Sequence, residues 1–376
     1  MMIGFDAKRA AQNKTGLGNY SRFVIEALTR FAPNERYLLY IPNPNRTSSL
    51  NGIEKANNVE LRYPQTTFWK KFRSLWRVWG ITSDIEKENI RLFHGLSNEL
   101  PLNIRKAENT RSIVTIHDLI FLRYPEYYHY IDRKIYAYKF RKACQNADRI
   151  IAVSECTKRD IISFFHIPEE KIDVVYQGCD AQFKQAVPEN IKEEIRRKYQ
   201  LPQRYILYLG SIESRKNLLL IAKALLHIQE PITVIAIGKR TPYAETVEDF
   251  LRKNHLENRM RLLSNIPFKE LPAFYQMATT FVYPSFFEGF GIPLLEALNS
   301  GVPAIGATGS CLEEAGGPHS IYIHPEDDKE LAKAIEQTLT DQSLRERMIK
   351  EGKKYALLFE EEKLTKDLLN VYRKTI

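Results

Sequence analysis

Residues 285–296 read SFFEGFGIPLLE, and the apolar run VPAIG follows at residues 302–306. This stretch predicts a loop that becomes a helix and then leads into a buried strand. Pro293 suits the start of the helix because proline has no N–H to leave unpaired. Gly301 is placed to end the helix about two turns later. A helix between two strands is the unit from which α/β sheets are built.

Two carboxylates, Glu288 and Glu296, bracket this loop. A helix start presents unpaired backbone N–H groups and the positive end of a dipole, which favour a bound phosphate. Carboxylates aimed at a phosphate would repel it, but carboxylates can accept hydrogen bonds from sugar hydroxyls. The stretch therefore indicates a ligand with both parts, such as a nucleotide-sugar.

The 376 residues are enough for two domains of ordinary size. The net charge of +9 indicates an anionic partner (a polyphosphate substrate, nucleic acid or acidic lipid) or only a basic soluble surface. The four cysteines form no C-x-x-C pair, so the sequence indicates neither a zinc site nor a disulfide framework. It has no signal-peptide pattern and no apolar run of the roughly 20 residues that span a bilayer. We therefore expect a cytoplasmic protein.

The first half of the chain predicts a Rossmann-like domain over residues 1–180. A short strand at residues 2–5 is followed by the glycine motif KTGLGNY and by apolar residues at helical spacing. Further strands are expected at residues 37–41, 59–63, 111–116, 149–153 and 172–176, with helices at 131–146 and after Ser154. The strand at 111–116 places His117 at its carboxyl end, where open α/β sheets bind ligands.

The second half predicts another parallel sheet. Residues 177–190 lose periodicity and are expected to form a linker. Strands are then expected at residues 204–210, 232–238, 260–264, 280–285, 302–306 and 320–323. The end of the chain is expected to be helical from about Asp327, with breaks near Gly352 and Phe359. The predicted fold class is α/β, with domains at residues 1–180 and 190–359 that face one crevice.

Two further sites in the sequence are candidates for chemistry. Arg215 and Lys216 lie in the loop GSIESRKN, just before a helix start, which suits a diphosphate. An arbitrary Arg-Lys pair is more often solvated, and a lone histidine such as His117 is more often structural. Their positions at the carboxyl ends of predicted strands favour function in both cases. Gly16 and Gly18 form only G-x-G, without the third glycine of a dinucleotide fingerprint, so they are a weak signal.

Several chemistries have no motif in this chain. D-x-D and H-E-x-x-H are absent, which disfavours metal-dependent chemistry, and G-x-S-x-G is absent, which disfavours a serine triad.

The segment FWKKFRSLWRVW, residues 68–79, contains all three tryptophans. As one helix it would carry five apolar side chains on one face: Phe68, Phe72, Leu75, Trp76 and Trp79. Such a basic, tryptophan-rich helix can lie on an anionic membrane surface, or it can bury its aromatic face against the sheet. Binding of nucleic acid ranks below both because no known module for it is present.

With these residues in hand, the chain resembles a retaining glycosyltransferase of the GT-B fold, in glycosyltransferase family 4. The resemblance covers nearly the whole length. It rests on FDAKRA and TGLGNY near the start, TIHDLIFLRYPEYY at 115–128, VSECTKRDI at 153–161, VVYQGCD at 174–180, YLGSIESRKNL at 208–218, the long segment from Val282 to Gly306, and HPEDDKELAKAI at 324–335. The two glutamates with seven residues between them are the most specific element.

The resemblance implies roles for particular residues. Catalytic roles fall to Glu288 beside the transferred sugar, Arg215 and Lys216 on the donor diphosphate, and His117 on the sugar. Donor binding is implied for Gly16, Gly18, Gly210, Phe290, Gly291, Ile292, Leu295 and Glu296, with Glu296 on the ribose hydroxyls. A C-terminal helix at about 360–376 is implied to join the first, acceptor-binding domain, and residues 190–359 to bind the donor.

The activity implied is transfer of a hexose of mannose or glucose type, with retention, from a nucleotide-diphosphate sugar to a glycan or lipid-linked acceptor. Such enzymes assemble cell-surface polysaccharide such as lipopolysaccharide, and no metal or other cofactor is expected. The chain departs from the family pattern at Asn19, where arginine is usual, and at Glu361, where tryptophan is usual. A non-catalytic sugar-nucleotide-binding subunit of a membrane-associated assembly is an alternative. A nicotinamide dehydrogenase is disfavoured by the incomplete glycine fingerprint.

Overall fold

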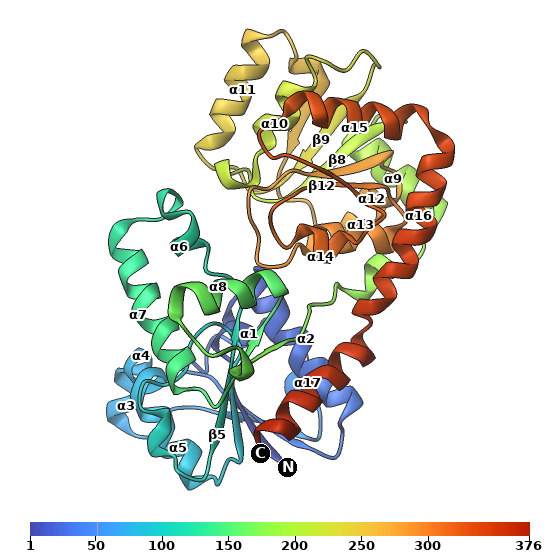
Figure 1. The fold of residues 1–376 in the computed structure, drawn as a ribbon. Coiled ribbons are helices and arrows are strands. Elements are labelled where there is room, and N and C mark those ends of the chain that lie inside the picture. The colour runs from blue at the N-terminus through green and yellow to red at the C-terminus, as the bar shows by residue number, and fades with distance from the viewer. Residues whose placement is uncertain (51) are drawn as a thin grey trace. The chain divides into compact units, whose positions relative to one another are not determined.

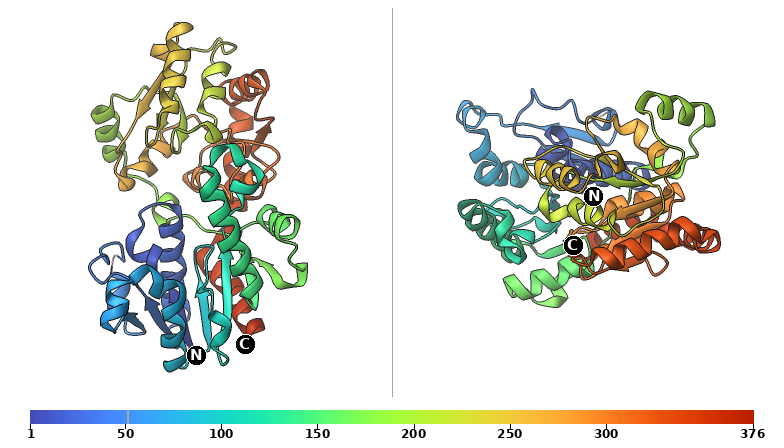
Figure 2. Two further views of the ribbon diagram at one scale, coloured as in Figure 1. Left: turned by 90° about the vertical axis from the view of Figure 1, so that its left-hand side faces the viewer. Right: turned by 90° about the horizontal axis from the view of Figure 1, so that it is seen from above.

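The structure is a computed structural model, and it describes residues 1–50 and 52–376 (Figure 1). The chain divides into two compact units. Unit 1 comprises Met1–Gln177 and Glu360–Ile376, and unit 2 comprises Gly178–Phe359. Each unit is built on one parallel sheet with helices packed on its faces (Figures 1 and 2).

Unit 1 has a seven-stranded sheet in the order β3-β2-β1-β4-β5-β6-β7. The strands are β1 (Met2–Asp6), β2 (Arg36–Tyr40), β3 (Val59–Arg62), β4 (Leu92–Gly95), β5 (Arg111–Ile116), β6 (Arg149–Ala152) and β7 (Ile172–Val174). The chain adds β2 and β3 on one side of β1 and later adds β4 on its other side. The carboxyl ends of β1 and β4 therefore flank a switch in strand order, where doubly wound sheets bind ligands.

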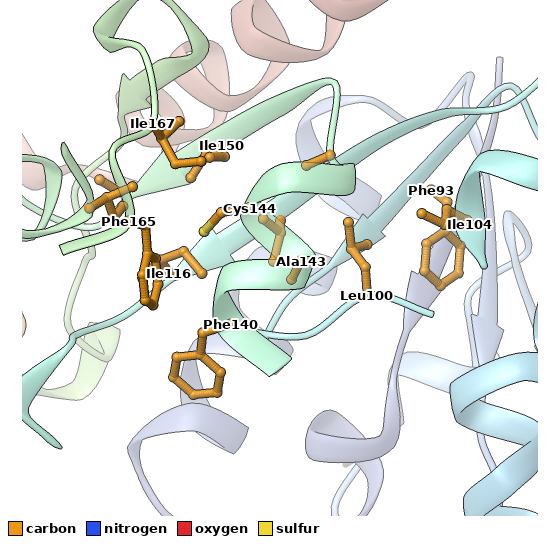
Figure 3. Packing of buried hydrophobic residues seen from close by; sticks show 14 of the residues in the cluster. Phe93, Leu100, Ile104, Ile116, Phe140, Ala143, Cys144, Ile150, Phe165 and Ile167 are labelled. Carbon is orange, nitrogen blue, oxygen red and sulfur yellow. The ribbon is translucent and has the colours of Figure 1, made fainter. Parts of the chain in front are cut away.

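The helices of unit 1 cover both faces of this sheet. They are α1 (Lys8–Gln12), α2 (Gly16–Phe31), α3 (Thr67–Lys71), α4 (Arg73–Leu75), the π-turn η2 (Trp76–Gly80), α5 (Ile81–Lys87), α6 (Ile120–Arg123), α7 (Tyr130–Asn146), α8 (Glu155–Phe165) and α17 (Glu361–Thr375). Neighbouring residues of β2, β4, β5 and β6 enter two different apolar clusters, as a sheet buried on both faces requires. Figure 3 shows one cluster, in which Phe140 and Cys144 of α7 pack near Ile116 and Ile150 of the sheet.

Unit 2 has a six-stranded sheet in the order β10-β9-β8-β11-β12-β13. The strands are β8 (Tyr205–Leu209), β9 (Thr233–Ile237), β10 (Met260–Leu263), β11 (Thr280–Tyr283), β12 (Ala304–Ala307) and β13 (Ile321–Ile323). The helices are α9 (Glu189–Tyr199), α10 (Leu218–Ala224), α11 (Tyr243–Lys253), α12 (Leu271–Gln276), α13 (Ile292–Ser300), α14 (Leu312–Gly316), α15 (Asp328–Thr340) and α16 (Gln342–Ala356). Here the strand order switches between β8 and β11.

The predicted strands are confirmed, and the structure adds β4, which the sequence analysis missed. That strand has four residues, one of them a histidine, so its apolar pattern is too short to stand out. The predicted break near Gly352 is wrong, because this glycine lies inside α16, where a Cβ atom would come within 2.9 Å of Leu298. The helix instead starts at the Asp341 side chain, which accepts a hydrogen bond from the Leu344 N–H at 2.9 Å.

Residues 178–190 are not a loose linker. They include the 3-10 turn η6 (Ala181–Lys184) and the start of α9. The Phe183 side chain is fully buried, and its ring centroid lies 5.5 Å from that of Tyr275 in an edge-on contact. This aromatic contact packs the segment onto unit 2.

The prediction of one amphipathic helix over residues 68–79 is wrong. The segment is broken into α3, α4 and η2, and the wider π-turn directs Trp76 into the core. There the Trp76 indole Nε1–H donates to Asp84 Oδ2 at 2.7 Å. The other four side chains of the expected apolar face are exposed: Phe68, Phe72, Leu75 and Trp79. Among the described residues, no helix combines the length and apolar character that crossing a bilayer requires.

Candidate active site

Two loops of unit 2 meet at the switch in strand order. One follows β8 and runs from Gly210 to Asn217, including the 3-10 turn η7 (Ser214–Lys216), and the other follows β11 and leads into α13. The Phe286 N–H donates to the Arg215 carbonyl at 2.9 Å, and Asn217 Nδ2 donates to the Pro284 carbonyl at 3.1 Å. These bonds hold the loop of Arg215 and Lys216 against the loop of Glu288.

The Glu288 carboxylate is held by three donors. Its Oε1 atom accepts from the Tyr283 hydroxyl at 2.8 Å and from Ser285 Oγ at 2.9 Å, and it lies 2.9 Å from Arg215 Nη1. Burial on its own would raise the pKa of this carboxyl. The charges of Arg215 and Lys216 and the two hydroxyl donors outweigh burial, and the pKa lies below its usual value. Glu288 is therefore ionised at neutral pH although only 15% of its side chain is exposed.

The two neighbouring cations are held differently. Arg215 is shared, because its Nη2 atom also lies 2.8 Å from Glu213 Oε1 and its guanidinium donates to the Phe287 carbonyl. Lys216 Nζ lies 5.6 Å from the centre of the Tyr283 ring. An anion bound at this loop would therefore contact Arg215, whose charge is already paired with two carboxylates, and Lys216, whose ammonium group lies near the Tyr283 ring.

At two positions of the site, Gly210 and Gly291, a larger residue would clash with a neighbouring side chain. Gly210 leaves room for the lysine, since a Cβ atom there would come within 3.1 Å of Lys216 Cδ. Gly291 caps α13 with a φ of 116°, and a Cβ atom would come within 2.8 Å of Leu312 Cδ2. Pro293 is the second residue of α13, one position later than predicted, and Gly301 ends the helix as predicted, with a φ of 73°.

Glu296 lies within α13 and is buried. Its Oε2 atom accepts from the Tyr275 hydroxyl at 2.9 Å. Burial raises the pKa of Glu296 to about 8, although the hydrogen bond from Tyr275 acts in the opposite direction. The two glutamates of the motif therefore differ, because the carboxyl of Glu296 is largely protonated at neutral pH when no ligand contacts it.

The side chains next to these glutamates serve mainly for packing. Phe290 and Leu295 are buried, and the ring centroids of Phe290 and Phe359 are 5.5 Å apart. Ile292 is half-buried. A ligand contact from Phe290 or Gly291 would therefore have to involve the backbone, whereas the Ile292 side chain is partly accessible.

His117 lies in unit 1, directly after β5, and is buried. Its Nε2 atom lies 2.9 Å from the Leu96 carbonyl oxygen, which can only accept, so Nε2 carries the proton. Its Nδ1 atom then accepts from the Gln177 amide at 3.3 Å. Burial lowers the pKa of His117 to about 4, partly offset by the bond to Leu96, so the ring is neutral at pH 7.

Gly16 and Gly18 are not in a loop, contrary to the prediction, but in the first turn of α2. Gly18 permits a close backbone contact, because a Cβ atom would lie 1.9 Å from the Asn13 carbonyl oxygen, whereas a Cβ at Gly16 would meet nothing within 4 Å. Asn19, the residue that departs from the family pattern, accepts from Arg22 Nη2 at 2.5 Å. Arg22 also donates to the Asn13 carbonyl at 2.8 Å, so it fixes the turn before α2.

Sequence reasoning missed a buried polar chain in unit 1 that supports His117. The Tyr20 ring packs edge-on against the His117 ring, with centroids 4.6 Å apart, and its hydroxyl lies 3.2 Å from Thr115 Oγ1. Thr115 Oγ1 lies 2.8 Å from His94 Nε2, and His94 Nδ1 lies 2.7 Å from the Tyr372 hydroxyl of α17. Tyr20 belongs to the TGLGNY motif, which was the one available signal. The other members are far apart in sequence.

The structure thus groups the candidate residues within each unit. Glu288, Arg215, Lys216 and Gly210 come together in unit 2, and the charge of Lys216 acts on both Glu288 and Glu296. His117 and the glycine turn are connected by Tyr20 in unit 1. Within residues 1–50 and 52–376, no group of three or more His, Cys, Asp or Glu side chains is arranged to hold a metal ion.

Comparison with known proteins places the chain in a family. Residues 191–355 match the model of the glycosyl transferases group 1, and residues 23–183 match that of glycosyltransferase family 4. The O-antigen chain mannosyltransferase B of Escherichia coli is 32% identical over 392 residues, covering 99% of this chain and 100% of that protein.

Solved structures share the fold. The glycosyltransferase from Rickettsia africae ESF-5 matches with a TM-score of 0.78 at 15% identity, covering 100% of this chain and 98% of that one. Anabaena HepE, solved in complex with UDP and glucose, matches with a TM-score of 0.76 at 17% identity, covering 99% of both chains. The chain therefore belongs to glycosyltransferase family 4 within the group 1 glycosyl transferases, and it is a glycosyltransferase with the GT-B fold of two Rossmann-like domains.

Proposed function

We propose that the enzyme transfers a hexose of mannose or glucose type, with retention, from a nucleotide-diphosphate sugar to a glycan or lipid-linked acceptor in the assembly of a cell-surface polysaccharide. The full-length relative, an O-antigen chain mannosyltransferase, supports a mannosyl donor. HepE, the structural neighbour solved with UDP and glucose, supports a nucleotide-sugar.

The single observation that carries the proposal is the ionised, nearly buried Glu288 beside Arg215 and Lys216. Lys216 and Arg215 would contact the donor diphosphate and offset its negative charge as it leaves. The Glu288 carboxylate, beside the hexose, would favour the positive charge that builds at the anomeric carbon. In this proposal the cations would lie on the leaving group and the anion beside the sugar, which is the charge pattern that this bond cleavage needs.

The remaining candidate residues would position the donor. Glu296 would accept hydrogen bonds from the ribose hydroxyls, and the backbone of Phe290 to Ile292 would donate to the hexose. His117 would accept a hydrogen bond from the sugar at Nδ1, in place of the Gln177 amide, and would do so as a neutral ring because its lowered pKa leaves it uncharged at pH 7. We propose that the cation pair takes the electrostatic role of a metal and that the reaction needs none.

We further propose that the enzyme works in the cytoplasm at the inner face of the membrane, where lipid-linked acceptors are found. The exposed Phe68, Phe72, Leu75 and Trp79, with neighbouring lysines, would contact anionic lipid. Trp76 takes no part because it is buried in the core. Flotation with anionic vesicles tests this contact.

The purified protein, treated with EDTA, should transfer hexose from a GDP- or UDP-sugar to an oligosaccharide acceptor at the same rate as untreated protein. Product anomers read by NMR should have the configuration of the donor. A rate restored only by added Mg²⁺ or Mn²⁺ would contradict metal independence. Donor binding without any transfer would favour the non-catalytic subunit instead.

Glu288→Gln should lower kcat by about 10²- to 10³-fold with a small change in donor KM, because the lost charge acts mainly in the transition state. Glu213→Gln is the matched control, since Glu213 is a carboxylate on the same Arg215 guanidinium. We expect it to lower kcat less than about tenfold. Steady-state kinetics measure both, and equal losses in the two variants would remove Glu288 from the reaction.

Because the pKa of Glu296 is raised from 4.5 to about 8 in the folded protein, its contribution to the free energy of unfolding should fall as the pH rises through this window. In this window the unfolded carboxyl is ionised while the buried folded one keeps its proton, so the folded state loses up to about 1.4 kcal/mol per pH unit. Below the window both forms are protonated and the contribution is complete. Glu296→Gln should remove this slope, while Glu257→Gln, at an exposed position, should keep it. Urea unfolding at a series of pH values measures the free energy of unfolding of each protein. If this free energy depends on pH in the same way for wild type and Glu296→Gln, Glu296 is not buried in its protonated form.

A further inference from the structure

The loop that follows β4 brings a glutamate to the switch in strand order of unit 1. It runs from Leu96 to Glu99, beside the carboxyl end of β1. A Cβ atom at Gly95 would lie 2.1 Å from the Glu99 carbonyl oxygen, so this glycine allows the loop to fold back tightly. Asn98 Oδ1 accepts a hydrogen bond from the His117 backbone N–H at 2.7 Å. The loop is therefore bonded to the residue that we propose contacts the sugar.

Glu99 belongs to a buried ion cluster that the proposed reaction does not use. Its Oε2 atom lies 2.7 Å from Arg77 Nη1 of the π-turn η2, and Arg77 Nη2 lies 2.6 Å from Asp6 Oδ2 at the carboxyl end of β1. The side chains of Arg77 and Asp6 are only 10% and 5% exposed. Buried ion pairs rarely stabilise a fold more than well-packed apolar residues would, and π-turns are frequent at functional sites. A ligand explains this cluster better than stability does.

The second carboxylate oxygen of Glu99 remains available to a ligand. Within residues 1–50 and 52–376 no hydrogen bond to Glu99 Oε1 is seen, and Lys139 Nζ of α7 lies 3.7 Å from it, beyond hydrogen-bond distance. The side chains of Glu99 and Lys139 are 19% and 37% exposed, so a ligand can reach both. Arg77 meanwhile fixes the carboxylate through its other oxygen.

The chemistry of these two groups selects an uncharged ligand with hydroxyl groups. Burial on its own would raise the pKa of Glu99, but the charges of Arg77 and Lys139 outweigh it, so the pKa lies below its usual value and the carboxylate is ionised at neutral pH. A carboxylate only accepts hydrogen bonds and an ammonium group only donates them, whereas a hydroxyl does both. Two neighbouring sugar hydroxyls can therefore donate to Glu99 and accept from Lys139. A phosphate would be attracted by Lys139 but repelled by Glu99.

We propose that Glu99 and Lys139 form a subsite that binds an uncharged sugar of the acceptor through two neighbouring hydroxyls. The assignment of this sugar to the acceptor rests on the proposed function, whereas binding of the sugar itself does not. Asn98 connects the subsite to His117, so the acceptor sugar would bind at the same edge of the sheet as the residue that would contact the transferred hexose.

The test is NMR titration of the full chain with the methyl glycosides of mannose, glucose, galactose and N-acetylglucosamine, with and without GDP or UDP. Glu99→Gln should bind the preferred glycoside at least about fivefold more weakly, because a neutral acceptor atom replaces a charged one. Glu60→Gln is the matched control and should bind like wild type. Glu60 is also a carboxylate of unit 1 held by two cations, Arg36 and Arg62.

A second pair of variants tests the cation. Lys139→Met should also bind the glycoside more weakly than wild type, because the ammonium donor is lost. Lys142→Met removes an exposed lysine of the same helix and should leave the affinity unchanged. The affinity for GDP or UDP, which we assign to unit 2, should be the same in all four variants, and this shows that each is folded.

Three results would overturn the proposal. They are no glycoside binding by wild type, equal glycoside binding by wild type and Glu99→Gln, and binding of mannose 6-phosphate or glucose 6-phosphate that exceeds glycoside binding and is lost in Lys139→Met. The last result would assign the cluster to an anionic ligand. Glycoside binding that depends on Glu99, without any hexose transfer, would leave the subsite standing and contradict the proposed reaction. Transfer with an unchanged acceptor KM in Glu99→Gln would support the reaction and contradict the subsite.

Discussion

The ion pair between Arg215 and Glu288 is the contact on which the candidate site depends. The two residues come from loops that follow neighbouring strands, and the pair joins them where the strand order of unit 2 switches. Each charge is poorly exposed, so removing Arg215 would leave the Glu288 carboxylate buried without its ion-pair partner, whereas removing Glu288 would leave Arg215 paired with Glu213. The same pair keeps Glu288 ionised. Burial keeps Glu296, eight residues later, protonated, and no ion pair to it is seen within residues 1–50 and 52–376.

Most of the fold could be predicted because parallel strands buried on both faces give short apolar runs that stand out in a sequence. The exceptions have local causes. Strand β4 has too few apolar residues to be seen, and Gly352 looks like a helix end although it serves a close contact with Leu298. At Trp76 helical periodicity failed, because a π-turn changes which residues share a face.

The site could be predicted in part. The positions of Glu288, Arg215 and Lys216 after two strands imply that they lie at one edge of the sheet, and the structure groups them there. The sequence did not reveal that Arg215 also forms an ion pair with Glu213. It also did not reveal that the His117 ring packs against Tyr20, whose hydroxyl is connected through Thr115 to His94. These partners depend on tertiary contacts between distant segments, for which a single sequence carries no local pattern.

We propose that unit 2 binds the donor diphosphate through the loop of Arg215 and Lys216. Calorimetric titration of GDP and UDP into wild type, Lys216→Gln and Lys223→Gln tests it most directly. Lys223 is an exposed lysine on α10, which begins directly after this loop, and so is the matched control. We expect Lys216→Gln to bind the preferred nucleotide at least about tenfold more weakly, a loss of about 1.4 kcal/mol, and Lys223→Gln to bind it like wild type. Equal affinities for all three proteins would contradict diphosphate binding by this loop.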